Sequence, residues 1–448
     1  MSFSVGEAFC PETCAVRRTR LCQVLSQEAE DGIVVLPSAP RVFRNGDVEH
    51  PYRQDSNFFY LTGFEEPESL CVIDVRERKA SLFLQPRDSE RELWDGPRIG
   101  LEGALECYRF EQAFPSSVIR VELPKLLQSH SVVYYDLGVF PTWDALVLDS
   151  LRELRERRGT ERPTRIVELS LYLHEMRLLK GDVELLAMRE AASITAEAHM
   201  RVMRFARPGL CEYEIETMLL DTFRRRGAAR EAYPSIVAAG SNATTLHHRA
   251  GVRRLQDGEL LLVDAGCEYD YYASDVTRTF PANGIFFPEQ KEIYELVYHA
   301  QLASLQSVRV GTTLEEIHQR SVEVITHGLV ELGLLTGNAQ ELIENGGYKQ
   351  FFPHRTSHWL GMDVHDVGAY LVKGAPRVLA PGMVFTVEPG IYISANCTRV
   401  EDKWRGIGVR LEDNIIVTQD GFLNLTSELP KTVQEVEGAC RENSRDIG

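Results

Sequence analysis

The chain has 448 residues, 44% hydrophobic and 26% charged, a composition typical of a soluble globular protein with two or three domains. Its 49 basic and 66 acidic residues give a formal net charge of −17, which argues against a general nucleic-acid-binding or membrane-surface protein. No apolar run approaches the roughly 18 residues of a membrane helix, and nine scattered cysteines without a CxxC pair indicate reduced thiols in a cytoplasmic protein.

The N-terminal part alternates short apolar runs with turn residues, including IVVLPSAP, NFFYLTGF and LCVIDV between residues 33 and 75. We interpret these runs as strands that alternate with helical stretches such as 142–158. The charged stretch RERRGTERPTR, which contains glycine and proline, is typical of a surface connection. We therefore expect a smaller mixed α/β domain over residues 1–178 and a second domain over residues 179–448.

Two pairs of helices are predicted in the second domain. The first pair begins near Asp182, a candidate cap, and continues in a helix over residues 212–226. The second pair begins at Pro288, which suits a first helical turn, and continues after Thr313-x-x-Glu316, which resembles a capping box. Strands follow each pair, so the order of elements predicts an internal repeat of helix pair and antiparallel sheet. The two copies span about residues 180–280 and 288–416.

Each copy contains an apolar strand that ends on an acid and is followed by glycine. One strand reads GELLLVDAG and ends on Asp264, and the other reads GMVFTVEPG and ends on Glu388, 124 residues later. Acids are almost never fully buried without a partner, because burying an isolated carboxylate is too costly. Two such acids in equivalent places predict a shared cationic partner, and a divalent metal is the first candidate.

Asp264 has an acidic companion at Asp275, across the segment CEYDYYAS. If this segment is a hairpin whose central residues are Tyr269 and Asp270, the two aspartates lie directly opposite each other. Their Cβ atoms would then be about 4.5–5.5 Å apart, an arrangement that is destabilising for like charges unless a cation lies between them. A slipped register with one aspartate in solvent is the alternative.

Glu388 has a companion at Glu412 in GIGVRLEDNIIV, which an intervening loop could bring beside it. Three histidines, His354, His358 and His365, lie between the two halves. One histidine with four carboxylates forms an oxygen-rich ligand set that suits two hard or borderline divalent ions such as manganese. Four carboxylates also balance the charge of two divalent ions, while the pattern leaves open which histidine is the ligand.

The sequence contains one further histidine cluster, and the motifs of other kinds of active site are incomplete or absent. His247 and His248 form a further histidine cluster, one member of which is expected to be structural or exposed. The HEMRL segment at residue 174 lacks the second histidine of a zinc-binding HExxH motif. Neither a G-x-S-x-G nucleophile elbow nor a phosphate-binding GxxxxGK[ST] loop occurs in the sequence.

The motifs VDAG…SDVTRTFP, SHWLGMDVHD, TVEPGIY and GIGVRLEDN, in this order, resemble those of the proline-specific aminopeptidases P of the "pita-bread" metallopeptidases, a group that includes the prolidases. FRNGDVEHPYRQDSNFFYLTGF resembles the N-terminal domain of the bacterial-type enzymes. The resemblance implies an α+β chain whose C-terminal domain has the pita-bread fold, with pseudo-two-fold helix pairs over a curved antiparallel sheet. It also implies two divalent ions, expected to be Mn²⁺.

By position, Asp264 and a bridging Asp275 resemble the ligands of one metal. His358 and Glu388 would hold the other metal, and Glu412 would bridge both. The family implies a metal-bridging hydroxide that attacks the carbonyl preceding proline, with Glu388 passing the proton to the leaving nitrogen.

The resemblance also implies roles for residues around the metals. His247 and His365 would stabilise the oxyanion and position the peptide, and Arg410 would support the site electrostatically. His354 and Tyr392 would line the proline pocket.

From the N-terminal domain, Asp47 and Trp94 resemble positions that reach an active site across a subunit boundary in a homodimer or homotetramer. A turn aspartate and a core tryptophan are the alternative interpretations of these two residues. The function that the resemblance implies is an aminopeptidase acting on peptides with proline in the second position, and involves neither nucleic acid nor membrane. Prolidase activity on Xaa-Pro dipeptides and a non-catalytic binding protein with this fold are the alternatives.

Overall fold

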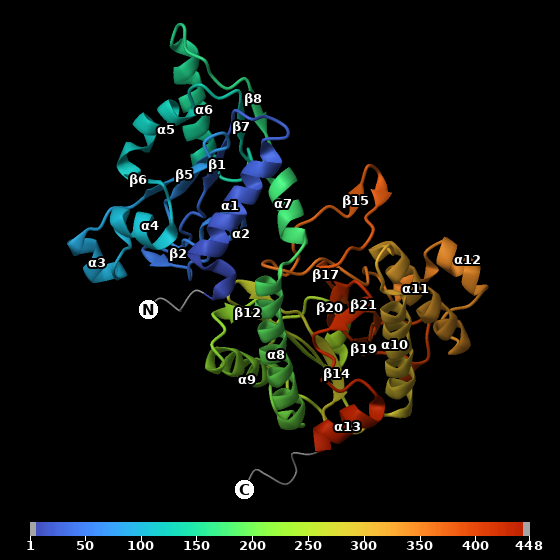
Figure 1. The fold of residues 1–448 in the computed structure, drawn as a ribbon. Coiled ribbons are helices and arrows are strands. Elements are labelled where there is room, and N and C mark those ends of the chain that lie inside the picture. The colour runs from blue at the N-terminus through green and yellow to red at the C-terminus, as the bar shows by residue number, and fades with distance from the viewer. Residues whose placement is uncertain (1–5, 442–448) are drawn as a thin grey trace. The chain divides into compact units, whose positions relative to one another are not determined.

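The computed structural model describes residues 6–441 of the chain. The chain divides into two compact units, Met1–Met176 and Arg177–Gly448 (Figure 1). Each unit is described separately below. All nine cysteines are free thiols, as expected from their scattered positions. Among the described helices, none is both long and apolar enough to cross a membrane.

The first unit is built on a six-stranded mixed sheet in the order β6-β5-β4-β1-β7-β8. β1 pairs antiparallel with β4 and parallel with β7, so the sheet combines hairpin and crossover connections. The strands of this sheet are β1 (Gly32–Pro37), β4 (Leu70–Asp74), β5 (Lys79–Leu84), β6 (Gln112–Pro115), β7 (Val132–Tyr134) and β8 (Arg165–Val167). The helices are α1 (Pro11–Leu25), α2 (Ser56–Thr62), α3 (Ser89–Asp95), α4 (Gly100–Tyr108), α5 (Ile119–Leu127), α6 (Pro141–Glu156) and α7 (Ser170–Leu178), which runs to the unit boundary.

One expected strand of this unit is a helix. The segment NFFYLTGF forms α2, because Asp55 caps its first turn by accepting a hydrogen bond from the backbone N–H of Phe58 at 2.8 Å. Gly63 ends the helix in the left-handed conformation, with φ at 63°. The apolar residues of α2 are buried on every side, so the sequence lacks the alternation that separates helix from strand.

The second unit contains the two predicted helix pairs. α8 (Asp182–Phe205) packs against α9 (Glu212–Arg225), and α10 (Pro288–Ser307) packs against α11 (Leu314–Glu331). The capping box of α11 is confirmed, since Thr313 and Glu316 exchange hydrogen bonds at 3.2 and 2.8 Å. α8 differs from expectation, because its cap hydrogen bond joins the Gly181 N–H to Glu184 instead of using Asp182. The remaining helices are α12 (Ala339–Glu344) and α13 (Val433–Arg441).

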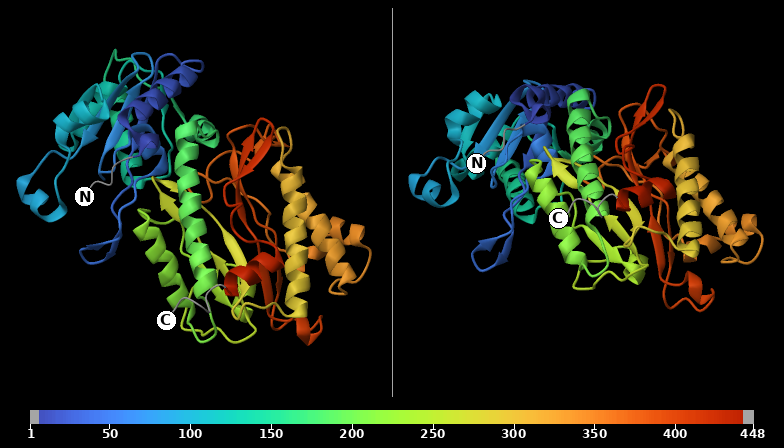
Figure 2. Two further views of the ribbon diagram at one scale, coloured as in Figure 1. Left: turned by 60° about the horizontal axis from the view of Figure 1, so that its bottom comes forward. Right: turned by 90° about the horizontal axis from the view of Figure 1, so that it is seen from below.

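Antiparallel strands follow each helix pair. The first half contributes β9 (Arg230–Glu231), β10 (Ile236–Ala239), β11 (Leu260–Asp264), β12 (Cys267–Tyr269), β13 (Tyr272–Ala273) and β14 (Thr277–Pro281). The second half contributes β15 (Leu371–Val372), β16 (Ala375–Pro376), β17 (Val384–Val387), β18 (Gly390–Ile393), β19 (Ile407–Arg410), β20 (Asp413–Thr418) and β21 (Gly421–Asn424). α8 lies against β12 and β13, whereas α10 lies against β17, β18 and β19 (Figure 2). Both helix pairs and both sets of strands share one apolar core.

The hairpin that carries the first acid pair has a different register from the predicted one. Its turn is centred on Asp270 and Tyr271, both in the left-handed region with φ of 47° and 62°, so Asp264 pairs with Thr277 rather than with Asp275. The observed pairing therefore differs from the predicted pairing by two residues along one strand. Because side chains alternate with a period of two, Asp275 still lies on the same face as Asp264.

We expect Gly266→Ala to damage this hairpin. A Cβ atom on Gly266 would lie 1.7 Å from the carbonyl oxygen of Ser274, so the two strands would have to separate. We expect a loss of about 1–3 kcal/mol of unfolding free energy, measured by urea denaturation, together with weaker metal binding. Gly438→Ala in α13 is the matched control, since its Cβ meets nothing within 4 Å and should be neutral or slightly stabilising. Equal stability of the Gly266→Ala variant and the wild type would contradict the expectation.

Candidate metal centre and active site

A cavity of about 700 Å³ opens in the second unit. Its wall contains all five residues expected to bind metal, namely Asp264, Asp275, His358, Glu388 and Glu412. It also contains the four remaining charged or histidine side chains expected in this domain's site, namely His247, His354, His365 and Arg410. The structure therefore gathers these nine side chains, which span more than 160 residues of sequence, around one space.

The second acid pair is positioned by a continuous antiparallel register. Val387 pairs with Asp413 in one sheet, and Gly390 pairs with Arg410 in the next. Glu388 and Glu412 lie between these two paired positions, directly opposite each other. The intervening loop thus brings the two glutamates together as expected. Glu412 is buried, at 2% exposure.

The first acid pair is joined by a tyrosine that the sequence analysis did not single out. The hydroxyl of Tyr233 contacts Asp264 at 2.6 Å and also lies within hydrogen-bonding distance of Asp275. On its other oxygen, Asp264 accepts a hydrogen bond from the Arg410 guanidinium. Burial raises the pKa of Asp264, which the positive charge of Arg410 opposes.

His358 is oriented as a metal-binding imidazole. Its Nδ1 donates to the carbonyl oxygen of Trp359 at 2.9 Å, which leaves Nε2 to face the carboxylates. Nε2 lies 3.3 Å from Asp275 and 3.5 Å from Glu388. Burial would lower the pKa of His358, but the hydrogen bond to Asp275 and the charge of Glu388 raise it to about 9. A bound cation would take the place of the proton that this pKa places on Nε2.

The donor set fits divalent cations. One ligand atom from each of Asp275, His358 and Glu412 lies within 4.8 Å of the other two. Burial raises the pKa of Glu412 well above its usual range, and the charges of Asp275, Glu388 and Asp264 raise it further. Burial likewise raises the pKa of Glu388 to about 7. These carboxylates therefore repel one another strongly in the absence of cations, and oxygen-rich ligation with one imidazole suits ions such as Mn²⁺.

A chain of hydrogen bonds fixes His354 beside the residues expected to bind metal. Arg410 donates to the Tyr392 hydroxyl at 2.9 Å, and that hydroxyl donates to Nε2 of His354 at 2.8 Å. Nδ1 of His354 donates to the carbonyl oxygen of Arg355 at 2.7 Å. Burial and the charge of Arg410 lower the pKa of His354 to about 3, so the ring is neutral and has one tautomer.

The other predicted residues lie in different surroundings. His365 packs edge-on against the ring of His358, with centroids 4.4 Å apart, and His247 is exposed on the cavity wall. Asp47 lies at the exposed turn between β2 (Phe43–Asn45) and β3 (Val48–Glu49). Trp94, in α3, is 86% exposed, so the alternative of a core tryptophan is wrong.

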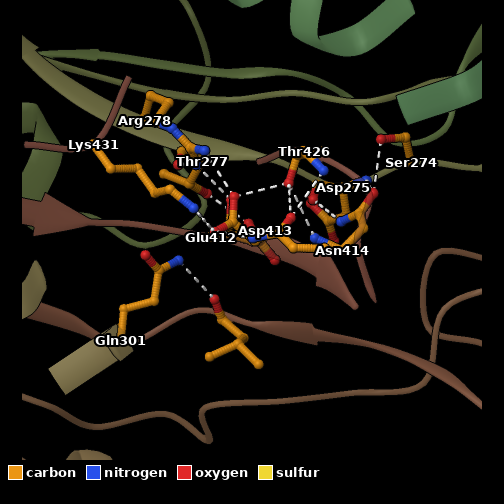
Figure 3. A network of polar contacts seen from close by, with 12 residues as sticks. Ser274, Asp275, Thr277, Arg278, Gln301, Glu412, Asp413, Asn414, Thr426 and Lys431 are labelled. Atoms are coloured by element: carbon orange, nitrogen blue, oxygen red, sulfur yellow. Dashed lines mark hydrogen bonds and ion pairs between the residues drawn. The ribbon is translucent and has the colours of Figure 1, made fainter. Parts of the chain in front are cut away.

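A buried polar network surrounds Asp275 and Glu412, the two acids expected to bridge the ions (Figure 3). The side-chain amide of Asn414 accepts from the backbone N–H of Asp275 at 3.1 Å and donates to the carbonyl oxygen of the same residue. The Thr277 hydroxyl donates to Glu412 at 2.7 Å. Arg278 donates to the Glu412 carbonyl oxygen at 2.6 Å. Residues of the opposite half therefore hold both Asp275 and Glu412, through the backbone or through the carboxylate.

Sequence reasoning missed Tyr233, Thr277 and Asn414. Thr277 and Asn414 belong to the quoted motifs SDVTRTFP and RLEDN, so their closeness to the acids was a usable signal. Tyr233 lies 31 residues before Asp264, and nothing near it in the sequence marks it as a partner of the aspartates.

His199, in α8, should make the protein sensitive to acid. Its Nε2 donates to the Ala265 carbonyl oxygen at 3.1 Å, and burial lowers its pKa from 6.5 to about 4. The unfolded chain therefore binds a proton that the folded protein excludes. The contribution of His199 to the free energy of unfolding is fully present above pH 6.5 and decreases by about 3 kcal/mol as the pH falls to 4. His199→Gln keeps the donor but cannot titrate, so its unfolding free energy should fall less between pH 7 and 4.5. Parallel curves for the two proteins would contradict this assignment.

Comparison with known proteins identifies the family of both domains. The sequence profile of metallopeptidase family M24 matches residues 186–419, and that of the aminopeptidase P N-terminal domain matches residues 14–134. The Xaa-Pro aminopeptidase of Escherichia coli is 41% identical over 421 residues, which cover 93% of this chain and 95% of that protein. Human Xaa-Pro aminopeptidase 3 is 35% identical, over 96% of this chain and 86% of its own. The structure of Pseudomonas aeruginosa aminopeptidase PepP superposes with a TM-score of 0.94 at 49% identity, over 97% of this chain and 98% of that one.

Proposed function

Because this chain belongs to metallopeptidase family M24, we propose that it is an aminopeptidase that releases the N-terminal residue from peptides with proline in the second position. The observation that carries this proposal is the convergence of four carboxylates and one imidazole on a single cavity. Relatives that share most of the length of the chain are named Xaa-Pro aminopeptidases, and the N-terminal domain profile also supports this activity over that of prolidase.

In this proposal, Asp264 and Asp275 hold one divalent ion, and His358 and Glu388 hold the other. Asp275 and Glu412 would be shared between the two ions. The expected ion is Mn²⁺, since the set is rich in carboxylate oxygen and contains no thiolate. When bound, the two ions would supply a water molecule of lowered pKa and polarise the carbonyl group of the substrate.

Glu388 is the residue best placed to move a proton. Its carboxyl group is half-buried on the cavity wall, and in the metal-free protein desolvation raises its pKa to about 7. The Thr386 hydroxyl, at 3.4 Å, orients one of its oxygens. A carboxylate in this place can accept a proton from the water molecule on one oxygen and return it to the leaving proline nitrogen.

The histidines divide the remaining tasks. His247 and His365 would donate hydrogen bonds to the oxygen on which negative charge develops. His354, locked as a neutral ring by Tyr392, would form a flat wall for the proline ring. A prolyl peptide bond has no N–H, so the site must recognise proline by the shape of the ring and not by a hydrogen bond. Arg410 would hold Asp264 and Tyr392 in place together.

Hydrolysis of three peptides tests the proposal. With Mn²⁺ present, the protein should release alanine from Ala-Pro-Ala and leave Ala-Ala-Ala intact, and a chelator should abolish the reaction. Cleavage of the dipeptide Ala-Pro without cleavage of Ala-Pro-Ala would identify a prolidase instead. Binding of Ala-Pro-Ala without cleavage, with both metals loaded, would point to the non-catalytic alternative.

We further propose a cytoplasmic homodimer or homotetramer in which Asp47 and Trp94 reach the active site of a neighbouring subunit. The 86% exposure of Trp94 leaves its ring free to contact another subunit. Sedimentation of the wild type and of Trp94→Ala measures the assembly, and a monomeric wild type would exclude this arrangement.

A further inference from the structure

One loop connects the strand β10 to the segment before β11 and carries His247 into the cavity wall. The loop runs from residue 239 to residue 251 and includes a short 3₁₀ helix, Gly240–Thr244. His247 is exposed within this loop, so its position follows from the backbone of the loop. Something outside the loop must therefore hold that backbone in place.

Glu212 lies beneath this loop, in the first turn of α9. Its side chain is fully buried, with 0% exposure, which is rare for a carboxylate. One oxygen accepts from the backbone N–H of Ala239 at 2.9 Å and from the side-chain amide of Asn242 at 2.8 Å. The other accepts from Nε2 of His248 at 2.9 Å and from the backbone N–H of Gly251 at 3.1 Å.

These four hydrogen bonds bind both ends and the middle of the loop to a single carboxylate. Two of the donors belong to the backbone at the loop's two ends, and His248 is the residue next to His247. Hydrogen bonds to the charged carboxylate lower the pKa of Glu212, against the effect of burial. Charge-assisted hydrogen bonds are the stronger ones in proteins, so the cluster is rigid.

A second contact fixes the loop from the other side. Gly408 of β19 lies so close to the 3₁₀ helix that a Cβ atom on it would be 2.3 Å from the carbonyl oxygen of Ala243. The loop is thus held between α9 of the first half and β19 of the second. Glu212 does not line the cavity, and its four hydrogen-bond donors include none of the five expected metal ligands.

We propose that Glu212 and His248 are positioning residues that set the place of His247 for the reaction. The inference rests on the proposed function, since His247 acts on the substrate only if the peptidase reaction takes place there. His248 is then the structural member of the His247–His248 pair. A misplacement of a catalytic group by about 1 Å can cost roughly 100-fold in rate, so the pair can matter without touching the substrate.

Replacement of His248 by leucine and by glutamine tests the proposal. His248→Leu removes the donor to Glu212 and should lower kcat for Ala-Pro-Ala by about 10-fold to 100-fold, with a smaller change in KM. His248→Gln restores an N–H donor to Glu212 and should recover most of the rate. His327→Leu, at an exposed histidine of α11, is the matched control and should leave the kinetics unchanged. Equal rates for His248→Leu and the wild type would overturn the proposal.

The same replacement in a His247→Ala background separates positioning from general damage. If His248 acts through His247, its removal should cost less than about 2-fold in the double variant. A full additional loss there would show that His248 serves the fold and not His247, and would overturn the proposal. Full activity of His247→Ala alone would also overturn it, while leaving the peptidase assignment intact.

Hydrogen exchange decides the inference independently of activity. In His248→Leu, the backbone amides of residues 239–251 should exchange faster than in the wild type, and those of α10 and α11 should not change. Glu212→Gln should give the same pattern with a larger effect, since either orientation of the amide turns its NH₂ toward two donors. If the wild type fails to cleave Ala-Pro-Ala, the proposed function fails. Unchanged exchange of this loop would instead overturn the positioning role.

Discussion

Replacing Glu412 by glutamine should reduce the hydrolysis of Xaa-Pro peptides by about 10³-fold, because a shared metal ligand contributes several kcal/mol to the reaction. The side chain keeps its size and can still accept the hydrogen bond from Thr277, so the fold should remain. Metal analysis of the purified variant should show reduced occupancy. Turnover and metal content equal to those of the wild type would exclude a role for Glu412 as a bridging ligand.

The same variant, although it loses activity, should be more stable than the wild type once metal is removed. In the metal-free protein, burial and the charges of Asp275, Glu388 and Asp264 raise the pKa of Glu412 well above its usual range. Near neutral pH the folded metal-free protein must then take up a proton that the unfolded chain has released, which opposes folding, and glutamine removes this cost. Metal-free Glu412→Gln should therefore melt at a higher temperature than the metal-free wild type. Glu428→Gln, at an exposed position, is the matched control and should change neither property.

Replacing Asp413 by asparagine should destabilise the protein by about 3–5 kcal/mol, since it leaves a buried guanidinium without its counter-ion. The side chains of Arg278 and Asp413 are both fully buried, and a guanidinium nitrogen of Arg278 lies 2.7 Å from a carboxylate oxygen of Asp413 (Figure 3). Asp413 also accepts from Lys431 at 2.7 Å and from the Thr426 hydroxyl at 2.8 Å. Urea denaturation of the metal-loaded protein measures the loss.

An exposed ion pair gives the comparison for this variant. Glu323→Gln removes the partner of Arg320 in α11, where both side chains are solvated, and should cost less than about 1 kcal/mol. Asp413→Asn should also impair catalysis, because Arg278 holds the Glu412 carbonyl oxygen. A loss as small as that of the exposed pair would show that the buried network does not support the site.

The fold class and the family followed from the order of motifs, and the comparisons confirm both. The acid-ended strands were visible because an apolar run that stops on a carboxylate is a local pattern. In the first domain the local pattern misled, since α2 is apolar on every side and its sequence suits a strand as well as a helix. Its true state depends on the cap at Asp55 and the left-handed Gly63.

The register of the first hairpin shows why the face on which a side chain lies was easier to predict than the residue with which it pairs. Moving the turn to Asp270 and Tyr271 shifts the partner of Asp264 by two residues, so the predicted direct opposition with Asp275 was wrong. The shift leaves the alternation of side chains unchanged, and the two aspartates still face one cavity.

The sequence by itself therefore determined which side chains were expected at one site, and they do line one cavity: the acids that end two strands, their companion acids and the histidines of the segment between them. Only the tertiary structure decided what holds them. Tyr233 joins the two aspartates, Asn414 fixes the backbone of Asp275, and Glu212 anchors the loop of His247. These contacts link residues from 31 to 139 positions apart. Side-chain packing between distant segments decides them, and no local pattern of residues encodes which segments will meet.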